Sequence, residues 1–553
     1  MTRNSLSLLA FALGLMALTL GGCGGRTTVR TDSWRQAPHT AVADLPPRAA
    51  VDCGSPVRGR PGGTVRLALP GGADPLNAPL PATEAERHLF ATLYETLIRV
   101  DCDGSLTGGL ATGWRAYEDG RVWVFDLREG ALFWDGTPVT PGSVAAAWRR
   151  AETLCLRRGE PDPFLLFSPA AVQAPAPGQL LIRLRTASDD LPLLLAHPAL
   201  AVVGRPGAGG WLAGTGPATP LPTADPDRLA LVARPDHPRA PAWERLDLVL
   251  DPAGDPRELL DAGLDALVTR DRAAVAYYRG RGGARPVDLP WDRWYYLLVP
   301  PEDPGQDPRD RRRWAAGWNR RELAREVAVA RAEPAEFFAY APRIRACSAL
   351  PPRVPVRPRV DLDAVSIQGQ RDVDLVLWPA DDPDARRLAE RLAAVAARPL
   401  RPADQLPGRG PLTPPVPPAE GVAPVAAAVA PASLAAQVQA ARAGAMVVPW
   451  PRRTASPCLE LARLLSLARW LRAAGLDPAV APDAIPPGAR AADPADTLDP
   501  LRTEAIARRL ERGDTVQPLI RTRATVILGG GLGGPTWNHD GSLRLETLGR
   551  TTR

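Results

Sequence analysis

Lysine is absent from this chain of 553 residues, so all 67 of its basic residues are arginine. Alanine, proline and glycine are abundant, a bias that is typical of a GC-rich genome and says little about function. The arginines are interspersed with 61 acidic residues, and the one tight arginine run, at 309–313, contains Asp310. The net charge of +6 therefore does not indicate nucleic-acid binding, and we expect no such partner.

Enzyme and cofactor motifs are also missing. The chain has no nucleophile elbow, no HExxH and no paired-carboxylate element, so we expect it not to be an enzyme. Its five histidines are scattered and its six cysteines fit no zinc spacing, so we expect no metal and no cofactor. Residues 529–534 fit G-x-G-x-x-G, but Pro535 and Thr536 follow where a dinucleotide site needs the start of a helix.

The apolar run at 6–20 is shorter than the roughly 20 residues that a membrane-spanning helix needs. It follows Arg3 and ends at Leu20-Gly21-Gly22-Cys23, so we predict a signal peptide at 1–22. Small residues before a cysteine resemble the lipobox of bacterial lipoproteins, which predicts lipidation of Cys23. We therefore expect an extracytoplasmic chain held at the bacterial cell membrane by its lipid. A plain signal peptide with a chance cysteine is the alternative.

The remaining cysteines are an odd number in a compartment where disulfides form, so at least one thiol stays free. They are Cys53, Cys102, Cys155, Cys347 and Cys458. Their pairing does not follow from the sequence.

Regular elements begin after a polar, proline-rich stretch at 23–61, which is typical of a flexible tether. Residues 64–69 predict a strand. Residues 84–100 predict a helix, because Leu89, Leu93 and Leu97 share one face and Thr83 with Glu86 can form a capping box.

The most informative stretch is 100–150. Asp-Gly pairs at 103–104, 119–120 and 135–136 indicate tight turns. Between them, Val122, Val124 and Asp126 alternate as in a half-buried strand, and a helix follows the third turn. A generic β-meander is the structural alternative.

The order of residues in this stretch resembles the signature region of the extracytoplasmic solute-binding proteins of family 5, the peptide- and nickel-type lipoproteins of ABC importers. The matching positions are Leu110, Ala111, Trp114, Asp119, Gly120, Phe125, Leu127, Arg128, Gly130, Phe133, Asp135, Gly136, Thr137, Pro138 and Val144. The resemblance implies an α/β, two-lobed periplasmic-binding-protein-like fold with an extra inserted domain. It also implies that Trp114, Phe125 and Phe133 are buried there.

Other segments extend this resemblance over about 64–340 and, more loosely, 430–550, so the C-terminal lobe is expected to diverge. They include Tyr94-Glu95-Thr96-Leu97, the turn Gly214-Thr215-Gly216-Pro217, a strand at 264–267, a crossing at 291–299 and a helix at 310–328. Farther along we expect a proline- and alanine-rich surface loop at 402–431, a helix at 433–442, a buried strand at 445–450 and closing strands from 518.

The implied domain organisation has three parts after the tether. Lobe I would comprise 62–78, 179–290 and 516–553. The inserted domain II would comprise 79–178, and lobe III would comprise 291–515.

The resemblance also implies a ligand cleft between the lobes, lined by the segment 77–83 and by a W-x-x-D-x-x-x-P element. Here Trp450 fits that element, but Arg453 stands where the aspartate would receive a peptide ammonium group. The expected ligand-binding residues are Leu80, Pro81, Ala82, Thr83, Val448, Trp450 and Arg453. If Arg453 faces the ligand, an anionic solute is favoured; the alternative is that it points to solvent.

The predicted function is a substrate-binding lipoprotein of an ABC importer, which captures a peptide-like or other small solute. Its expected partners are the transmembrane permease subunits, and it is expected to act as a monomer. The alternative from another class is a degenerate family member that serves as a sensor or envelope interaction lipoprotein.

Overall fold

The computed structural model describes residues 53–57, 62–158, 160, 163–164, 166–185, 187–252, 254–298, 320–335, 375–379, 382–396, 425–429, 445–455, 460 and 516–551. The predicted signal peptide, Cys23, most of the tether, the helix predicted at 433–442, Cys347 and Cys458 lie outside these residues. Among the residues described, no helix combines the length and the apolar character needed to cross a membrane.

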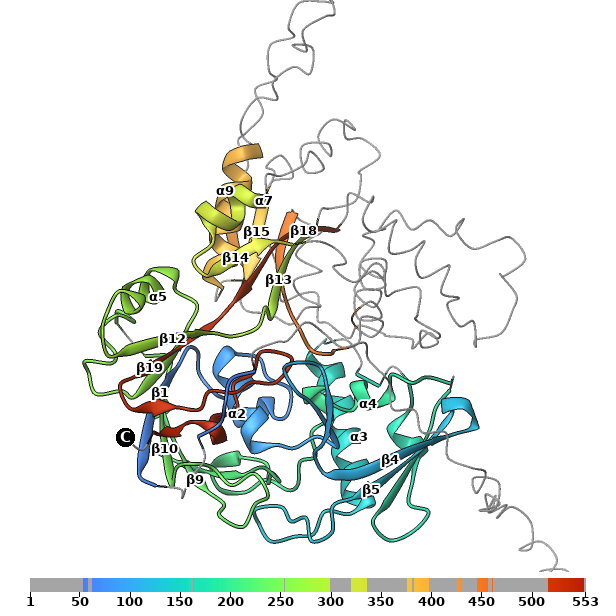
Figure 1. The fold of residues 1–553 in the computed structure, drawn as a ribbon. Coiled ribbons are helices and arrows are strands. Elements are labelled where there is room, and N and C mark those ends of the chain that lie inside the picture. The colour runs from blue at the N-terminus through green and yellow to red at the C-terminus, as the bar shows by residue number, and fades with distance from the viewer. Residues whose placement is uncertain are drawn as a thin grey trace, which may run out of the picture. The chain divides into compact units, whose positions relative to one another are not determined.

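The largest sheet has seven strands in the order β12-β19-β11-β1-β10-β9-β8 (Figure 1). β1 is parallel to β10 and β11 on its two sides, and the outer pairs are antiparallel. The strands are β1 (Thr64–Leu69), β8 (Ala218–Pro222), β9 (Arg228–Ala233), β10 (Arg245–Leu250), β11 (Ala266–Thr269), β12 (Ala284–Asp288) and β19 (Thr525–Gly529). The strand predicted at 64–69 is confirmed with the same bounds.

A second sheet has six strands in the order β14-β18-β13-β17-β15-β16. They are β13 (Arg293–Leu298), β14 (Arg331–Pro334), β15 (Leu375–Pro379), β16 (Val425–Val429), β17 (Ala445–Pro451) and β18 (Val516–Arg523). The buried strand predicted at 445–450 is β17. Helix α9 (Pro383–Ala396) buries Leu388 and Leu392 against Tyr295 and Leu297 of β13.

Two assignments for this region, one of a surface loop and one of a lobe, differ from the strand pairing in the structure. β16 lies within the predicted surface loop at 402–431, because its small apolar residues pair in parallel with β15. β18 was assigned to lobe I but pairs with β13 and β14 of the six-stranded sheet. Only Ala524 separates it from β19 of the other sheet, so a nearly continuous run of strand passes between the two sheets.

A third, four-stranded sheet has the order β4-β5-β7-β6 and contains the segment that resembled the family signature. Its strands are β4 (Ala111–Tyr117), β5 (Val122–Leu127), β6 (Val172–Gln173) and β7 (Gln179–Arg183). β7 was predicted to return to lobe I, but Leu180 pairs with Phe125 of β5. Sheet pairing between distant segments, which no local pattern reveals, explains this error.

Burial in this sheet agrees in part with prediction. Phe125 and Phe133 are buried, whereas Trp114 is only partly buried and packs against the core. β5 is not half-buried, because Val122 and Val124 also pack with Tyr117 and Leu181 on the other face. The turn glycines Gly104, Gly120 and Gly136 all have positive φ, as the Asp-Gly pairs predicted.

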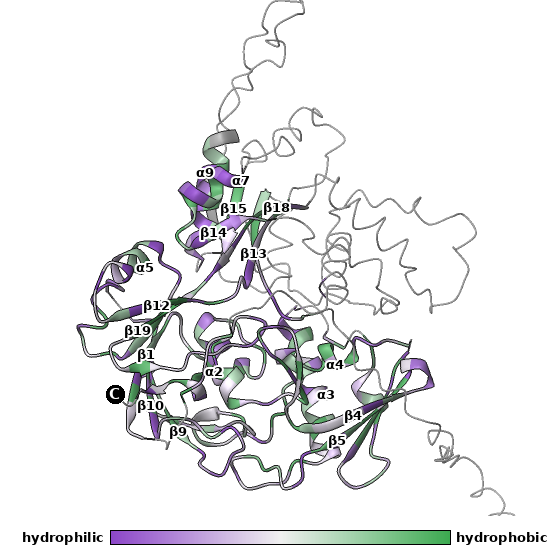
Figure 2. Cartoon of the chain, in the orientation of Figure 1, coloured by the Kyte–Doolittle hydropathy of each residue, from purple (hydrophilic) through white to green (hydrophobic). Residues whose placement is uncertain are grey.

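Helix α3 (Pro141–Arg158) follows the third turn and buries Val144, Ala147, Trp148 and Ala151 at helical spacing. Figure 2 accordingly shows hydrophobic and hydrophilic residues along this helix. Its remaining surface carries Arg149 and Arg150, which are exposed. The helix is thus amphipathic with one face in the core.

Helix α2 (Glu84–Leu93) has the predicted capping box between Thr83 and Glu86 but ends earlier than predicted. The predicted helix continued to 100, where the structure instead has strand β2 (Ile98–Val100). The backbone NH of Gly216 donates to the Leu93 carbonyl at 3.0 Å. A Cβ at Gly216 would lie 2.0 Å from the Thr92 carbonyl oxygen, so only glycine permits this approach.

Shorter elements complete the described chain. They are β3 (Leu106–Gly108), α4 (Leu191–Leu194), α5 (Arg272–Arg279), α7 (Arg320–Glu322), the π-helical turn η7 (Leu323–Val327), β20 (Leu532–Gly533), β21 (Gly549–Arg550) and the 3-10 turns η2 (Pro75–Asn77), η3 (Glu118–Gly120), η4 (Pro169–Ala171), η5 (Pro198–Leu200), η6 (Ala208–Gly210) and η11 (Leu545–Thr547). α7 and η7 are the described part of the helix predicted at 310–328.

Among the described residues, a disulfide joins Cys53 to Cys102, with the two Cα atoms 5.6 Å apart, and Cys155 is buried outside it. After Gly529 the chain forms a turn and β20 rather than a helix, as predicted for the glycine-rich segment.

Candidate ligand-binding pocket

A pocket of about 740 Å³, counted with its opening to solvent, lies beside α2. Its wall comes from four parts of the chain: the segment from before α2 to β2, the turn region 193–201 with Arg239, residues 453–455 after β17, and the loop 538–542. The lining residues are Pro79, Pro81, Arg87, Phe90, Ala91, Tyr94, Glu95, Thr96, Arg99, Val100, Leu193, Ala196, Pro198, Ala201, Arg239, Arg453, Thr454, Ala455, Asn538, His539, Asp540 and Ser542. The charged residues of this wall are four arginines and two carboxylates: Arg87, Arg99, Arg239, Arg453, Glu95 and Asp540.

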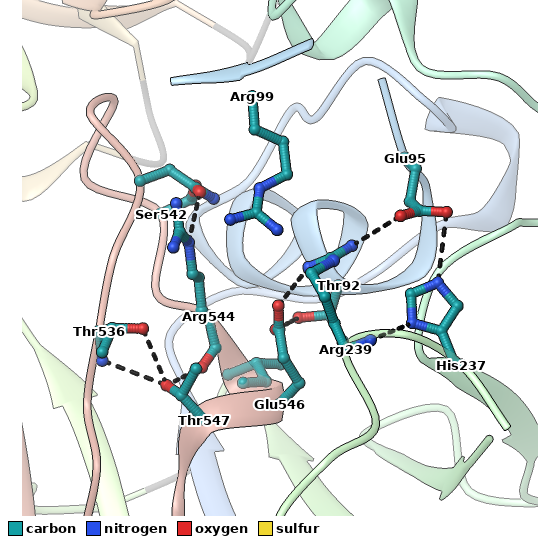
Figure 3. Close-up of polar contacts among 12 residues, drawn as sticks. Thr92, Glu95, Arg99, His237, Arg239, Thr536, Ser542, Arg544, Glu546 and Thr547 are labelled. Carbon is teal, nitrogen blue, oxygen red and sulfur yellow. Dashed lines mark hydrogen bonds and ion pairs between the residues drawn. The ribbon is translucent and has the colours of Figure 1, made fainter. Parts of the chain in front are cut away.

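Glu95 is the most strongly paired carboxylate of the wall. It lies 2.7 Å from Arg128. It also lies 3.3 Å from His237 and 3.3 Å from Arg239, as Figure 3 shows. Burial alone would raise the pKa of Glu95, but the bond from His237 and the charges of Arg239 and Arg128 hold that pKa far below its ordinary value. Glu95 is therefore an anion whose charge is already neutralised by its neighbours.

A second carboxylate, Glu546, lies next to this group. It pairs with Arg239 and accepts a hydrogen bond from the Thr92 hydroxyl at 3.4 Å. Arg544 pairs with Asp101, and Arg99 reaches the same Asp101 at 3.4 Å. In Figure 3 the Arg99 side chain points toward the group formed by Arg239, Glu546 and Arg544.

The electrostatic position of Arg99 is unfavourable. Burial and the neighbouring charges of Arg239 and Arg544 lower the pKa of Arg99 to about 10. The guanidinium is still charged at neutral pH, since this pKa remains about three units above pH 7.

Tyr94 follows α2 directly and is only 3% exposed. Its ring packs against Phe90 and Trp134, with centroids 5.5 and 6.0 Å away. Burial raises the pKa of Tyr94, so its hydroxyl keeps its proton. This hydroxyl has no hydrogen-bond partner among the described residues, and Tyr94 is one of the residues that line the pocket.

The opposite part of the wall contains Arg453. Its Nη2 donates to the Pro81 carbonyl at 3.0 Å, and its backbone NH donates to Glu460 at 3.1 Å. Arg453 is 8% exposed, so it does not point into bulk solvent. The bond to Pro81 links the segment after β17 to the segment before α2.

Only two of the seven residues that the sequence predicted as ligand-binding line this pocket, Pro81 and Arg453. Leu80 and Val448 are buried in hydrophobic clusters, Ala82 is exposed, and Thr83 caps α2. Trp450 is buried against Tyr296 with ring centroids 6.4 Å apart, and its Nε1 donates to Glu460 at 3.4 Å.

Arg99, Arg239 and the loop 538–542 were not among the predicted site residues. Tyr94 and Glu95 were predicted only as matches to a family helix. Arg239 contacts Glu95 across 144 residues of sequence, so no local spacing could have predicted the pair. The described residues contain no group of three or more His, Cys, Asp or Glu side chains suited to a metal ion.

A buried ionic network lies next to the pocket and joins both large sheets. Glu84, the first residue of α2, lies 2.9 Å from Arg270, which follows β11, and 3.2 Å from Arg293 of β13. Arg87 pairs with Glu84 and reaches Asp292 at 2.7 Å. Burial would raise the pKa of Glu84, but Arg270, Arg87 and Arg293 hold it well below its ordinary value.

Solved structures with this fold are bacterial binding proteins. The murein tripeptide binding protein MppA of Escherichia coli superposes with a TM-score of 0.64 at 14% identity, covering 89% of this chain and 99% of that chain. A dipeptide binding protein from Pseudoalteromonas, in complex with Met-Leu, gives 0.61 at 16% identity over 88% and 100% of the two chains. The fold is therefore that of the two-lobed periplasmic binding proteins.

Sequence comparison finds partial matches. Residues 105–353 match the model for bacterial extracellular solute-binding proteins, family 5. The chain is 29% identical over 134 residues to a putative binding protein of Haemophilus influenzae, which is 21% of this chain and 25% of that protein. It is 38% identical over 82 residues to the E. coli periplasmic murein peptide-binding protein MppA, 15% of this chain and 14% of that protein.

Over residues 105–353 the chain is similar to the bacterial extracellular solute-binding proteins of family 5. Its aligned segments span a quarter or less of these two curated relatives.

Proposed function

We propose that this protein is the substrate-binding component of an ABC importer and captures a peptide-like or other small solute in the pocket beside α2. The observation that carries this proposal is the composition of the pocket wall. It combines residues 79–100, which contain α2 and β2, with residues 453–455, which follow β17 of the six-stranded sheet. Sites between two lobes bury small molecules and close around them by hinge motion. Relatives named for murein peptides and for a dipeptide support a peptide-like ligand.

We also propose that Arg453 selects against a free peptide ammonium group. Arg453 lines the pocket at the position where the resembled element has an aspartate. A cation there opposes an ammonium group by on the order of 1–4 kcal/mol at contact distance. A planar guanidinium instead favours a carboxylate or phosphate, which it can bind through two parallel hydrogen bonds.

Calorimetric titration of the full chain tests this proposal. The titrants are tri-alanine with a free amino terminus and N-acetyl-tri-alanine. We expect the acetylated peptide to bind more tightly to the wild type, and Arg453→Asp to reverse that order. We expect Arg453→Asp to weaken binding of the acetylated peptide by roughly 2–5 kcal/mol. The reason is that the substitution puts a negative charge in place of a positive one in a desolvated site. Tight binding of the free peptide that Arg453→Asp leaves unchanged would show that Arg453 is outside the site.

The remaining parts of the proposal concern partners and location. We propose a monomer, anchored outside the cytoplasm by lipid on Cys23, that delivers its solute to the transmembrane permease subunits. The disulfide between Cys53 and Cys102 supports this location, since such bonds persist in oxidising compartments. Deletion of the gene should abolish uptake of the solute that the purified protein binds, which a transport assay measures. Unchanged uptake would instead favour a sensor or an envelope interaction protein.

A further inference from the structure

The pocket contains one arginine whose charge is poorly compensated. Arg87 is held between Glu84 and Asp292, and Arg239 between Glu95 and Glu546. In the described part of the chain, Arg99 instead forms an ion pair with one carboxylate, that of Asp101, at 3.4 Å.

That partner is shared, because Asp101 also pairs closely with Arg544. The Nε of Arg99 is buried and has no acceptor in the described part of the chain. Arg99 thus offers hydrogen-bond donors and positive charge to the pocket that it lines.

Tyr94 provides an independent observation in the same pocket. Its side chain is 97% buried, and its hydroxyl has no hydrogen-bond partner among the described residues. A buried hydroxyl without a partner is destabilising, and native proteins rarely retain one without a reason. A ligand that accepts a hydrogen bond would satisfy this hydroxyl.

We propose that the pocket contains an oxyanion subsite in which Arg99 binds a carboxylate or phosphate group of the solute and Tyr94 donates a further hydrogen bond to it. This inference rests on the proposed solute-binding function and specifies the chemical class of the solute. It is separate from Arg453, because Arg99 belongs to β2 and Arg453 follows β17.

The subsite has a physical rationale in the charges around it. Glu95 and Glu546 are already paired with other arginines, so the charge of Glu546 offsets that of Arg99 only in part. An oxyanion in the pocket would be attracted by Arg99, Arg239 and Arg544 together, in a site where water screens these charges weakly. The ligand would therefore supply the charge that the protein lacks there.

The experiment compares the full chain, purified in detergent, with Arg99→Gln and with Arg115→Gln. Arg115 is a matched control, since it pairs with Asp126 at 2.8 Å on the surface and does not line the pocket. Each protein is titrated with N-acetyl-tri-alanine and with its C-terminal amide, and inorganic phosphate is added as a competitor. Mass spectrometry identifies the solute that co-purifies with each protein.

We expect the acid to bind the wild type at least about tenfold more tightly than the amide, the usual difference for one charge-assisted hydrogen bond. Arg99→Gln should remove this preference, and Arg115→Gln should retain it. Competition by phosphate would extend the subsite to phosphate groups, and its absence would restrict it to carboxylates. A co-purified solute should carry an acidic group and be depleted from Arg99→Gln.

Equal binding of acid and amide to the wild type, or a bound solute without an acidic group, would overturn the subsite while leaving the proposed function intact. The absence of any co-purified solute together with no binding of either probe would overturn the proposed function itself. Unfolding curves of Arg99→Gln that match those of the wild type establish that the variant is folded.

Discussion

At the scale of single residues, the Tyr94 hydroxyl is proposed to bind the ligand and to lower the stability of the ligand-free protein. Tyr94 lines the pocket and its hydroxyl has no partner among the described residues, whereas the hydroxyl of Tyr278 donates to the Pro256 carbonyl at 3.0 Å. Both side chains are buried. Tyr278, whose hydroxyl forms a hydrogen bond, therefore serves as the control for Tyr94, whose hydroxyl forms none among the described residues.

Tyr94→Phe should raise the free energy of unfolding of the ligand-free protein by about 1 kcal/mol, since it removes an unsatisfied buried hydroxyl. Tyr278→Phe should lower that free energy by about 1 kcal/mol, because it removes a made hydrogen bond. Urea unfolding measures both. Tyr94→Phe should also weaken binding of the acidic probe, and a loss of stability in this variant would mean that the hydroxyl has a partner in the free protein.

At the scale of elements, the network around Glu84 connects α2 with the ends of β11 and the start of β13. Glu84→Gln leaves Arg87, Arg270 and Arg293 beside a neutral group, and we expect it to lower the free energy of unfolding by about 3–5 kcal/mol at pH 7. Glu390 is the control, since it pairs with Arg386 on the exposed surface of α9. Glu390→Gln should change stability by less than about 0.5 kcal/mol.

The same network predicts a pH dependence. The pKa of Glu84 in the folded protein lies well below its ordinary value of 4.5. The stability that it contributes is therefore complete above pH 4.5 and is lost as the pH falls toward the lowered value. Urea unfolding from pH 7 to pH 3 should show the difference between wild type and Glu84→Gln shrinking on the acid side. A difference that stays constant below pH 4.5 would contradict the pairing.

At the scale of the whole molecule, the described N-terminal segment 53–57 is attached to the body at two points. Cys53 is bonded to Cys102, 49 residues away, and the Val57 NH donates to the Thr547 carbonyl at 3.3 Å. The proposed lipid on Cys23 would thus be joined to the body by a segment that ends at Cys53.

Cys23→Ser should release the protein from the membrane fraction, because the substitution removes the residue whose lipid chains are proposed to hold the protein at the membrane. Immunoblots of membrane and soluble fractions measure the release, and an unchanged unfolding midpoint shows that the body remains folded. Cys155→Ser is the control, since Cys155 is buried in the body and is not the proposed lipid site. A Cys23→Ser protein that remains with the membrane after a carbonate wash would contradict the lipoprotein proposal.

Local patterns in the sequence were sufficient for most elements. The strand at 64–69, the turns at Gly104, Gly120 and Gly136, and the capping box of α2 depend on neighbours within a few residues, and all were predicted. The resemblance to the family rested on residues at characteristic spacings within one segment. Such a pattern can be recognised even where overall sequence identity is low.

Tertiary contacts decided the rest, because they join residues whose separation in the sequence carries no signal. α2 ends at Leu93, whose carbonyl accepts a hydrogen bond from the Gly216 NH, and β7 and β18 join sheets other than those predicted. The site followed the same rule: Arg453 could be suspected from its motif, whereas the grouping of Tyr94, Arg99, Arg239 and Arg544 came only from the fold. Charges and hydroxyls acquire a function from what surrounds them, and burial and pairing are properties of the folded chain.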